Sequence, residues 1–159
     1  LERAARGHRM AKATLEMAAW DAFARAEGRS LADALGGTAT SVAAGVSIGI
    51  HEDTAALVDR VADHLDEGYR RIKLKIAPGR DSDVLAAVRG RFPDIALTVD
   101  ANAAYGRADL DRLRALDRFG LDYIEQPFAE DALLLHAELQ ATMETPLCRW
   151  ICWLVKGLS

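Results

Sequence analysis

Short apolar runs alternate with amphipathic helical stretches along most of this chain, and the alternation keeps a steady interval. Polar residues at the ends of these runs are 26 residues apart from Ser47 to Lys73, 25 apart from Lys75 to Asp100, and 25 apart from Asp100 to Glu125. Parallel neighbouring strands need a crossover connection, which is usually a helix, so this alternation predicts a parallel sheet. The chain is therefore expected to be an α/β protein.

Periodicity, helix caps and glycine stops define the individual elements. Helices are predicted over 10–26, 52–68, 82–91, 107–119 and 131–141, with a short capped turn after Ser30. Strands are predicted over 42–50, 70–76, 95–100 and 121–125, and a fifth begins at 145. The small and β-branched residues of 42–50 indicate a buried strand.

The strand at 70–76 reads RRIKLKI and places Lys73 and Lys75 two residues apart. Side chains alternate between the faces of a strand, so both ammonium groups share one face while Ile72, Leu74 and Ile76 share the other. Lysines at a sheet edge often only prevent aggregation, and this is the plain alternative for an isolated Lys-x-Lys pair. The carboxylates that end the two following strands favour a functional interpretation.

Asp100 and Glu125 each follow an apolar strand directly, at the strand end where α/β folds place their active sites. Capping of the next helix is the alternative for Asp100; for Glu125 it is weaker, because Pro127 disfavours a helical turn there. Carboxylates on neighbouring strands suit a hard divalent cation, and magnesium is the natural choice. Asn102 is either a ligand-binding amide or a turn residue.

Together these groups suit one type of reaction. Two ammonium groups and a metal in one cavity are expected to lower the pKa of one lysine toward the range of a general base. Such a base removes the proton next to a carboxylate, and the metal stabilises the resulting enediolate. The expected partner is therefore a small-molecule carboxylate substrate.

Three motifs in this order resemble the barrel of the enolase superfamily, in its muconate-lactonizing subgroup: Lys73-Leu74-Lys75, Val99-Asp100-Ala101-Asn102 and Ile124-Glu125-Gln126-Pro127. Within that subgroup, GVSIGI and YIEQPFAEDALLLHAELQ are most similar to o-succinylbenzoate synthases and N-acylamino acid racemases. The resemblance covers about 11–148. It implies a (β/α) barrel, of which this chain holds about four units and the start of a fifth, preceded by a helix.

The resemblance also implies roles for single residues. Lys75 matches the catalytic base, and Lys73 matches the residue that tunes it and binds the substrate carboxylate. Asp100 and Glu125 match two ligands of Mg²⁺. Two further positions, Ser47 and Asn102, match substrate-binding positions. The implied reaction is the dehydration of a cyclohexadiene carboxylate to o-succinylbenzoate for menaquinone synthesis, or the racemisation of an N-acylamino acid; muconate cycloisomerase and dipeptide epimerase activities are further alternatives.

The sequence departs from the family pattern at both ends. Residues 1–41 are expected to be a helical segment from the capping-domain junction, 42–148 a partial barrel, and 149–159 an aberrant tail produced by a frameshift or gene disruption. The alternative is that the tail forms an amphipathic docking strand or helix. No carboxylate follows Glu144, so the third metal ligand of the family is missing. The chain is expected to be impaired or inactive as an enzyme.

Composition limits the remaining function classes. The net charge of -4 argues against nucleic acid or an anionic membrane as the main partner, and no run has the length of a membrane helix. A cytoplasmic location is expected, and a homo-oligomer is left open. Cys148 and Cys152 have no assigned role. The alternatives outside enzymes are a doubly wound α/β binding domain, with Gly45 and Gly49 as a weak phosphate-binding signal, and a non-catalytic remnant.

Overall fold

The computed structural model describes residues 7–149 and divides the chain into two compact units. The first unit comprises residues 1–42 and the second comprises residues 43–159. The predicted aberrant tail, apart from Arg149, lies outside the described residues, and so does the predicted end of the fifth strand near Trp150.

The first unit is a pair of helices. Helix α1 spans Arg9–Ala26 and ends before Gly28, whose φ of 67° is the left-handed conformation that glycine adopts readily. The short helix α2 spans Leu31–Ala34 and is capped by Ser30, whose hydroxyl oxygen accepts a 3.0 Å hydrogen bond from the amide of Asp33. Both features agree with the sequence prediction.

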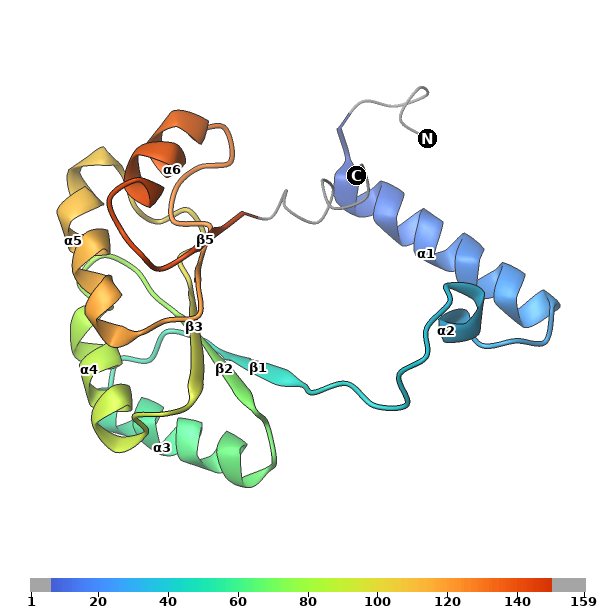
Figure 1. Cartoon of the computed structure of the whole chain (residues 1–159), viewed down its shortest axis with the longest axis horizontal. Helices are drawn as coiled ribbons and strands as arrows, with labels where there is room; N and C mark the ends of the chain where they lie inside the picture. Colours follow the sequence, from blue (N-terminus) through green and yellow to red (C-terminus); the bar gives the residue numbers. More distant parts are fainter. Residues whose placement is uncertain (1–6, 150–159) are drawn as a thin grey trace. The chain divides into compact units, whose positions relative to one another are not determined.

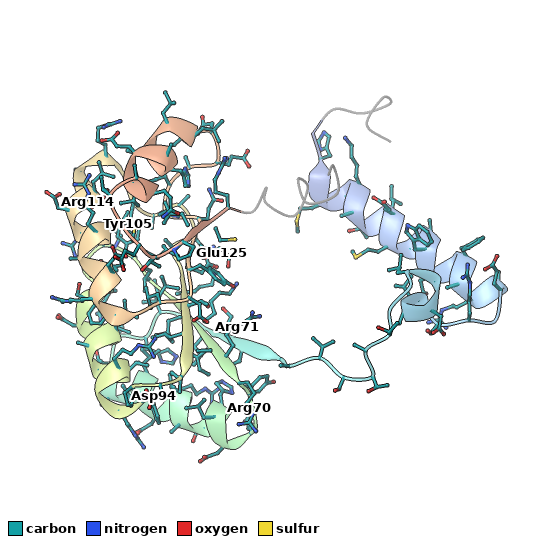
Figure 2. The ribbon with its side chains drawn as sticks, viewed as in Figure 1. Arg70, Arg71, Asp94, Tyr105, Arg114 and Glu125 are labelled. Carbon is teal, nitrogen blue, oxygen red and sulfur yellow. The ribbon has the colours of Figure 1, made fainter. Side chains whose placement is uncertain are left out.

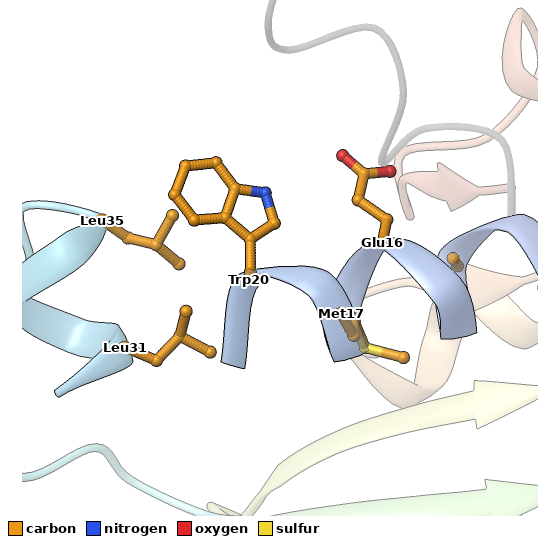
Figure 3. Close-up of a pocket in the computed structure, with 6 residues that line it drawn as sticks. Glu16, Met17, Trp20, Leu31 and Leu35 are labelled. Atoms are coloured by element: carbon orange, nitrogen blue, oxygen red, sulfur yellow. The ribbon is translucent and has the colours of Figure 1, made fainter. Parts of the chain in front are cut away.

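Apolar side chains of this unit line a shallow hollow of about 260 Å³ (Figure 3). Met17, Trp20 and Leu35 are 62%, 40% and 63% exposed. Exposure of large apolar side chains on one face is characteristic of a surface that binds another part of a protein.

The second unit is a parallel five-stranded sheet in the order β1-β2-β3-β4-β5 (Figure 1). The strands are β1 (Gly45–Ile48), β2 (Arg71–Lys75), β3 (Ala96–Asp100), β4 (Ile124–Glu125) and β5 (Leu147–Cys148). The helices between them are α3 (Thr54–Asp66), α4 (Ser82–Arg91), α5 (Leu110–Arg114) with flanking 3₁₀ turns η1 (Arg107–Asp109) and η2 (Ala115–Phe119), and α6 (Leu133–Gln140).

The order of the strands follows the order of the chain without reversal, and α3 to α6 lie on the same side of the sheet (Figure 1). A doubly wound domain reverses its strand order and carries helices on both faces. The predicted alternative of a doubly wound binding domain is therefore wrong, and the α/β class of the partial-barrel prediction is confirmed.

The predicted alternation of faces in β2 is observed. Ile72 and Leu74 are fully buried in the core beneath the helices, and Ile76 is 2% exposed. Lys73 and Lys75 alternate with them and keep part of their side chains accessible. The sheet thus has one apolar face toward the helices and one face that carries charged groups.

Two sequence predictions are wrong in detail. The continuous helix expected over 107–119 is a short α-helix between two 3₁₀ segments. Leu110, Leu113, Leu116 and Phe119 are buried, and they recur every third residue, which is the repeat of a 3₁₀ helix and not of an α-helix.

Strand β1 is shorter and more exposed than predicted. Of its residues only Ile48 is buried, because β1 is one of the two edge strands of the described sheet and pairs with β2 alone. Every helix within residues 7–149 is too short or too polar to span a lipid bilayer.

Candidate active site at the strand ends

The last residues of β2, β3 and β4 lie in one row across the sheet. Lys75 is the register partner of Asp100, and Asp100 is the register partner of Glu125. Two residues earlier along β2, Lys73 is the register partner of Ser47 on β1. Partners in register project from the same face of a sheet, so the predicted grouping of these side chains is observed.

Two lysine and carboxylate pairs connect this row. The Nζ atom of Lys73 donates a 2.8 Å hydrogen bond to Oε2 of Glu125, and the two side chains are 28% and 17% exposed. The Nζ atom of Lys75 lies 3.8 Å from Oδ2 of Asp100, with exposures of 41% and 8%. The acids are therefore the more buried members, while both amines keep access to the open face.

The hydrogen bond with Glu125 is the main reason that the pKa of Lys73 is raised; burial opposes this effect, and the charge of Asp100 adds to it. The sequence predicted that two ammonium groups and a metal in one cavity would lower the pKa of one lysine. Lys73 does not behave in this way, because its hydrogen bond to Glu125 and the nearby carboxylate charges outweigh the effect of burial. Lys73 therefore stays protonated at neutral pH and is suited to hold a substrate anion.

Asn102 connects the other lysine to its acid. Its side-chain oxygen Oδ1 accepts a hydrogen bond from Nζ of Lys75, and its Nδ2 donates to Oδ2 of Asp100 at 3.3 Å. Its main-chain amide donates to Oδ1 of Asp100 at 3.0 Å. Asn102 has a φ of 46°, so the predicted turn residue is observed, and its side chain lies between Lys75 and Asp100.

Ser47 faces a second part of the same surface. It lines a cavity of about 240 Å³ together with Gly45, Arg71, Lys73 and Tyr123. In Figure 2, Glu125 and Arg71 are labelled at different heights of the sheet, and Arg71 is the first residue of β2. The cavity extends the charged face toward the strand starts.

Asp100 and Glu125 fit a magnesium ion in their chemistry. Carboxylate oxygens are the ligands that Mg²⁺ prefers, and a protein often supplies only one or two of them while water and substrate complete the shell. Within residues 7–149, no group of three or more His, Cys, Asp or Glu side chains is arranged to hold a metal. The described residues thus offer a pair of acidic ligands.

Sequence reasoning included Gln126, which lies directly after Glu125, in a motif but gave it no role of its own. It is 1% exposed and has a φ of 44°, and its Nε2 donates a 2.6 Å hydrogen bond to the carbonyl of Phe128. Its main-chain carbonyl accepts from the amide of Ala103 at 2.7 Å, so it joins the two loops that follow the acidic residues. Its position before Pro127 was the available signal.

Two family models match this chain. One is described as enolase C-terminal domain-like and matches residues 56–149, which include β2 to β5. The chain belongs to the enolase superfamily. The other model, the N-terminal domain of mandelate racemase / muconate lactonizing enzyme, matches residues 1–36. The resemblance inferred from the three motifs is therefore confirmed.

Two names recur among the curated relatives of this chain, N-succinylamino acid racemase and o-succinylbenzoate synthase. An N-succinylamino acid racemase from Thermus thermophilus is 56% identical over 146 residues, which are 90% of this chain and 39% of the relative. An o-succinylbenzoate synthase from Geobacillus kaustophilus is 51% identical over 145 residues, with 91% and 39% covered. The chain thus spans about two fifths of the length of these relatives.

Solved structures of the enolase superfamily share the fold. A member from Listeria innocua is 44% identical, with a TM-score of 0.87 and coverage of 93% of this chain and 40% of its own. The L-talarate/galactarate dehydratase from Salmonella typhimurium, liganded with Mg, is 30% identical with a TM-score of 0.75; the match covers 82% of this chain and 35% of its own. The five-stranded sheet is consistent with part of a barrel of this type.

Proposed function

We propose that this chain supplies the base, two metal ligands and part of the substrate site for removal of the proton α to a carboxylate. The reaction is the dehydration that forms o-succinylbenzoate. The observation that supports it is the row of Lys75, Asp100 and Glu125 at neighbouring strand ends. The choice of reaction is supported by membership of the enolase superfamily and by relatives that are named o-succinylbenzoate synthase.

Lys75 is the proposed general base. Its side chain is more exposed than those of Lys73, Asp100 and Glu125, so it has access to a substrate above the sheet. In a dehydration, Nζ of the neutral amine takes the proton from the α carbon, and a hydroxyl leaves the neighbouring carbon; the two account for one water. Asn102 orients the amine through its Oδ1 atom.

Lys73 and Ser47 are proposed to bind the substrate. The protonated Lys73 provides a fixed positive charge beside the reacting carbon and contacts the substrate carboxylate. Ser47 is its register partner on β1, and both line the same cavity. Asn102 completes this group from the loop after β3.

Asp100 and Glu125 would hold Mg²⁺. When bound, this ion supplies positive charge that stabilises the enediolate form of the substrate. Because the described residues group only these two acids, we expect the chain by itself to bind Mg²⁺ weakly and to have impaired activity.

The test uses a chimera, in which the segment of the Thermus thermophilus racemase that matches this chain is replaced by this chain's own residues. The purified chimera, in Mg²⁺, is assayed for formation of o-succinylbenzoate and for racemisation of an N-succinylamino acid. We expect dehydration, and a loss of about 100-fold or more in Lys75→Ala. A folded chimera that is inactive in both assays contradicts the proposal.

Racemisation of an N-acylamino acid is the second candidate, because a racemase is 56% identical to this chain. Both reactions begin with the same proton transfer, so the residues described above serve either. A chimera that racemises but does not dehydrate decides for this candidate. A remnant without catalysis predicts neither activity.

A further inference from the structure

The loop that carries Asn102 is fixed on the side away from the candidate site. This loop, residues 101–106, connects β3 to η1. The amide of Ala103 donates to the carbonyl of Gln126 at 2.7 Å, and the amide of Tyr105 donates to the carbonyl of Pro127 at 3.1 Å. Two main-chain hydrogen bonds thus attach the loop after β3 to the loop after β4.

The side chain of Tyr105 provides a third attachment, to the loop after β2. Its phenol is 5% exposed in the core on the helix side of the sheet, and it is labelled there in Figure 2. The phenol donates a 3.0 Å hydrogen bond to Oδ2 of Asp81. Burial raises the pKa of the Tyr105 phenol, and the charge of Asp81 adds to this effect, so the phenol remains a donor.

The carboxylate of Asp81 accepts the hydrogen bond from Tyr105 and has further partners. Its carboxylate is 3% exposed and also accepts a 2.6 Å hydrogen bond from the amide of Ser82, at the start of α4. Arg112 of α5 supplies the opposite charge, with Nη1 at 3.4 Å from each carboxylate oxygen. A buried carboxylate with this set of partners is a rigid anchor.

Between these attachments the backbone is held in an unfavourable conformation. Asn102 and Ala103 have φ values of 46° and 62°. Asparagine adopts the left-handed region more readily than other residues with a Cβ atom, whereas alanine at Ala103 is strained there, and such strain is frequent at functional sites. This conformation places the Asn102 amide and side chain on Asp100 and its Oδ1 atom on Lys75.

We propose that Tyr105, through its hydrogen bond to Asp81, is a positioning residue that holds Asn102 between Lys75 and Asp100. This inference rests on the proposed function, in which Lys75 is the base and Asp100 a metal ligand. Without the phenol hydroxyl, the strained loop loses one of its attachments, and Asn102 leaves its position. Small displacements of catalytic groups reduce turnover more than substrate binding when the binding contacts stay in place.

The test is a double-mutant cycle in the chimera with Tyr105→Phe, Asn102→Ala and both together. Each single variant is expected to lower kcat about 10-fold or more and to change KM by a smaller factor, because Lys73 and Ser47 still bind the substrate. The double variant is expected to have the kcat of Asn102→Ala, because Tyr105 acts through Asn102. Losses that multiply in the double variant, or an unchanged kcat in Tyr105→Phe, overturn the inference. Tyr69→Phe, which removes a phenol hydroxyl from the segment between α3 and β2, is the matched control and should retain full kcat.

A second measurement separates this inference from the proposed function. In the isolated chain, the side-chain amide signals of Asn102 in ¹⁵N spectra are compared between the unsubstituted chain, Tyr105→Phe and Asp81→Asn. Shifted signals in both variants support the positioning role even if the unsubstituted chimera is inactive and the proposed function fails. Unchanged signals in folded variants overturn it, whatever the activity.

Discussion

Lys73 and Glu125 are 52 residues apart in sequence, and their side chains meet in a 2.8 Å hydrogen bond between neighbouring parts of the same sheet face. Lys73 extends from β2 past β3 to reach an acid on β4. The pair links a candidate substrate-binding group directly to a candidate metal ligand. A change in either residue is therefore expected to affect both binding functions.

Glu125→Gln is expected to weaken Mg²⁺ binding by the isolated chain about 10-fold or more, because it removes one of two acidic ligands. The measurement is a calorimetric titration, with Asp100→Ala as the second ligand variant. Glu144→Gln is the matched control, since that glutamate contributes a main-chain amide to Asp117 and its side chain is exposed. Equal affinity in Glu125→Gln and the unsubstituted chain contradicts the assignment of Glu125.

Lys75→Ala in the chimera is expected to slow exchange of the substrate α proton with deuterated water about 100-fold or more, since Lys75 is the amine in the row with Asp100. Proton NMR follows the exchange with an N-succinylamino acid. Lys12→Ala, on α1, serves as the control and should exchange at the full rate. Exchange that stays at the unsubstituted rate in Lys75→Ala assigns the base to another group.

Arg89→Lys is expected to destabilise the second unit by about 2–4 kcal/mol. The guanidinium donates to the carbonyls of Phe119 at 2.7 Å, Gly120 at 2.8 Å, Ile95 at 2.8 Å and Pro93 at 3.0 Å. A lysine keeps the charge but cannot reach this set of acceptors. Urea denaturation measures the loss.

Arg60→Lys on the exposed side of α3 is the control for the Arg89 experiment. A surface substitution of this kind is expected to change stability by less than about 0.5 kcal/mol. If both variants lose the same free energy of unfolding, the hydrogen bonds of Arg89 do not contribute the stability proposed for them.

His136 is expected to make the second unit less stable in acid. Burial lowers the pKa of its imidazole, partly opposed by the 2.8 Å hydrogen bond between Nδ1 and the carbonyl of Ala132. As the pH is lowered, the imidazole of the unfolded chain, with a pKa of about 6.5, binds a proton at a higher pH than the imidazole of the folded chain does. Stability is therefore complete above about pH 6.5 and falls as the pH is lowered toward the folded value.

The variant His136→Asn tests this dependence, because asparagine can keep the donor to the Ala132 carbonyl without titrating. Urea midpoints are compared at neutral pH and at about pH 5.5. The unsubstituted chain should lose more stability on acidification than the variant. Equal losses would falsify the role of His136.

Much of the fold follows from local patterns in the sequence. The strand interval and the alternation in β2 predicted the parallel sheet and its two unlike faces, since burial on one face requires apolar residues at every second position. The break of the predicted helix at 107–119 was missed. Its threefold repeat of Leu110, Leu113, Leu116 and Phe119 is visible in the sequence but differs only slightly from the α-helical repeat.

The candidate site could be predicted in its members but not in its contacts. Lys73, Lys75, Asp100 and Glu125 were identified because they end or occupy strands at a common interval. The partner that each lysine takes depends on side-chain reach across the sheet. Asp81 and Tyr105 were missed for a related reason: each is ordinary in its own loop, as a helix cap and an aromatic residue, and their contact joins two separate loops.

The shared row of Lys75, Asp100 and Glu125 makes the site sensitive to the number of residues in each strand. A single codon inserted within β3 ahead of Asp100 would reverse the direction of every later side chain in that strand. The carboxylate of Asp100 would then point into the apolar core beneath the helices, and Val99 would take its place beside Lys75. Insertions and deletions are consequently tolerable in the connecting loops, whereas β2, β3 and β4 must keep the same number of residues.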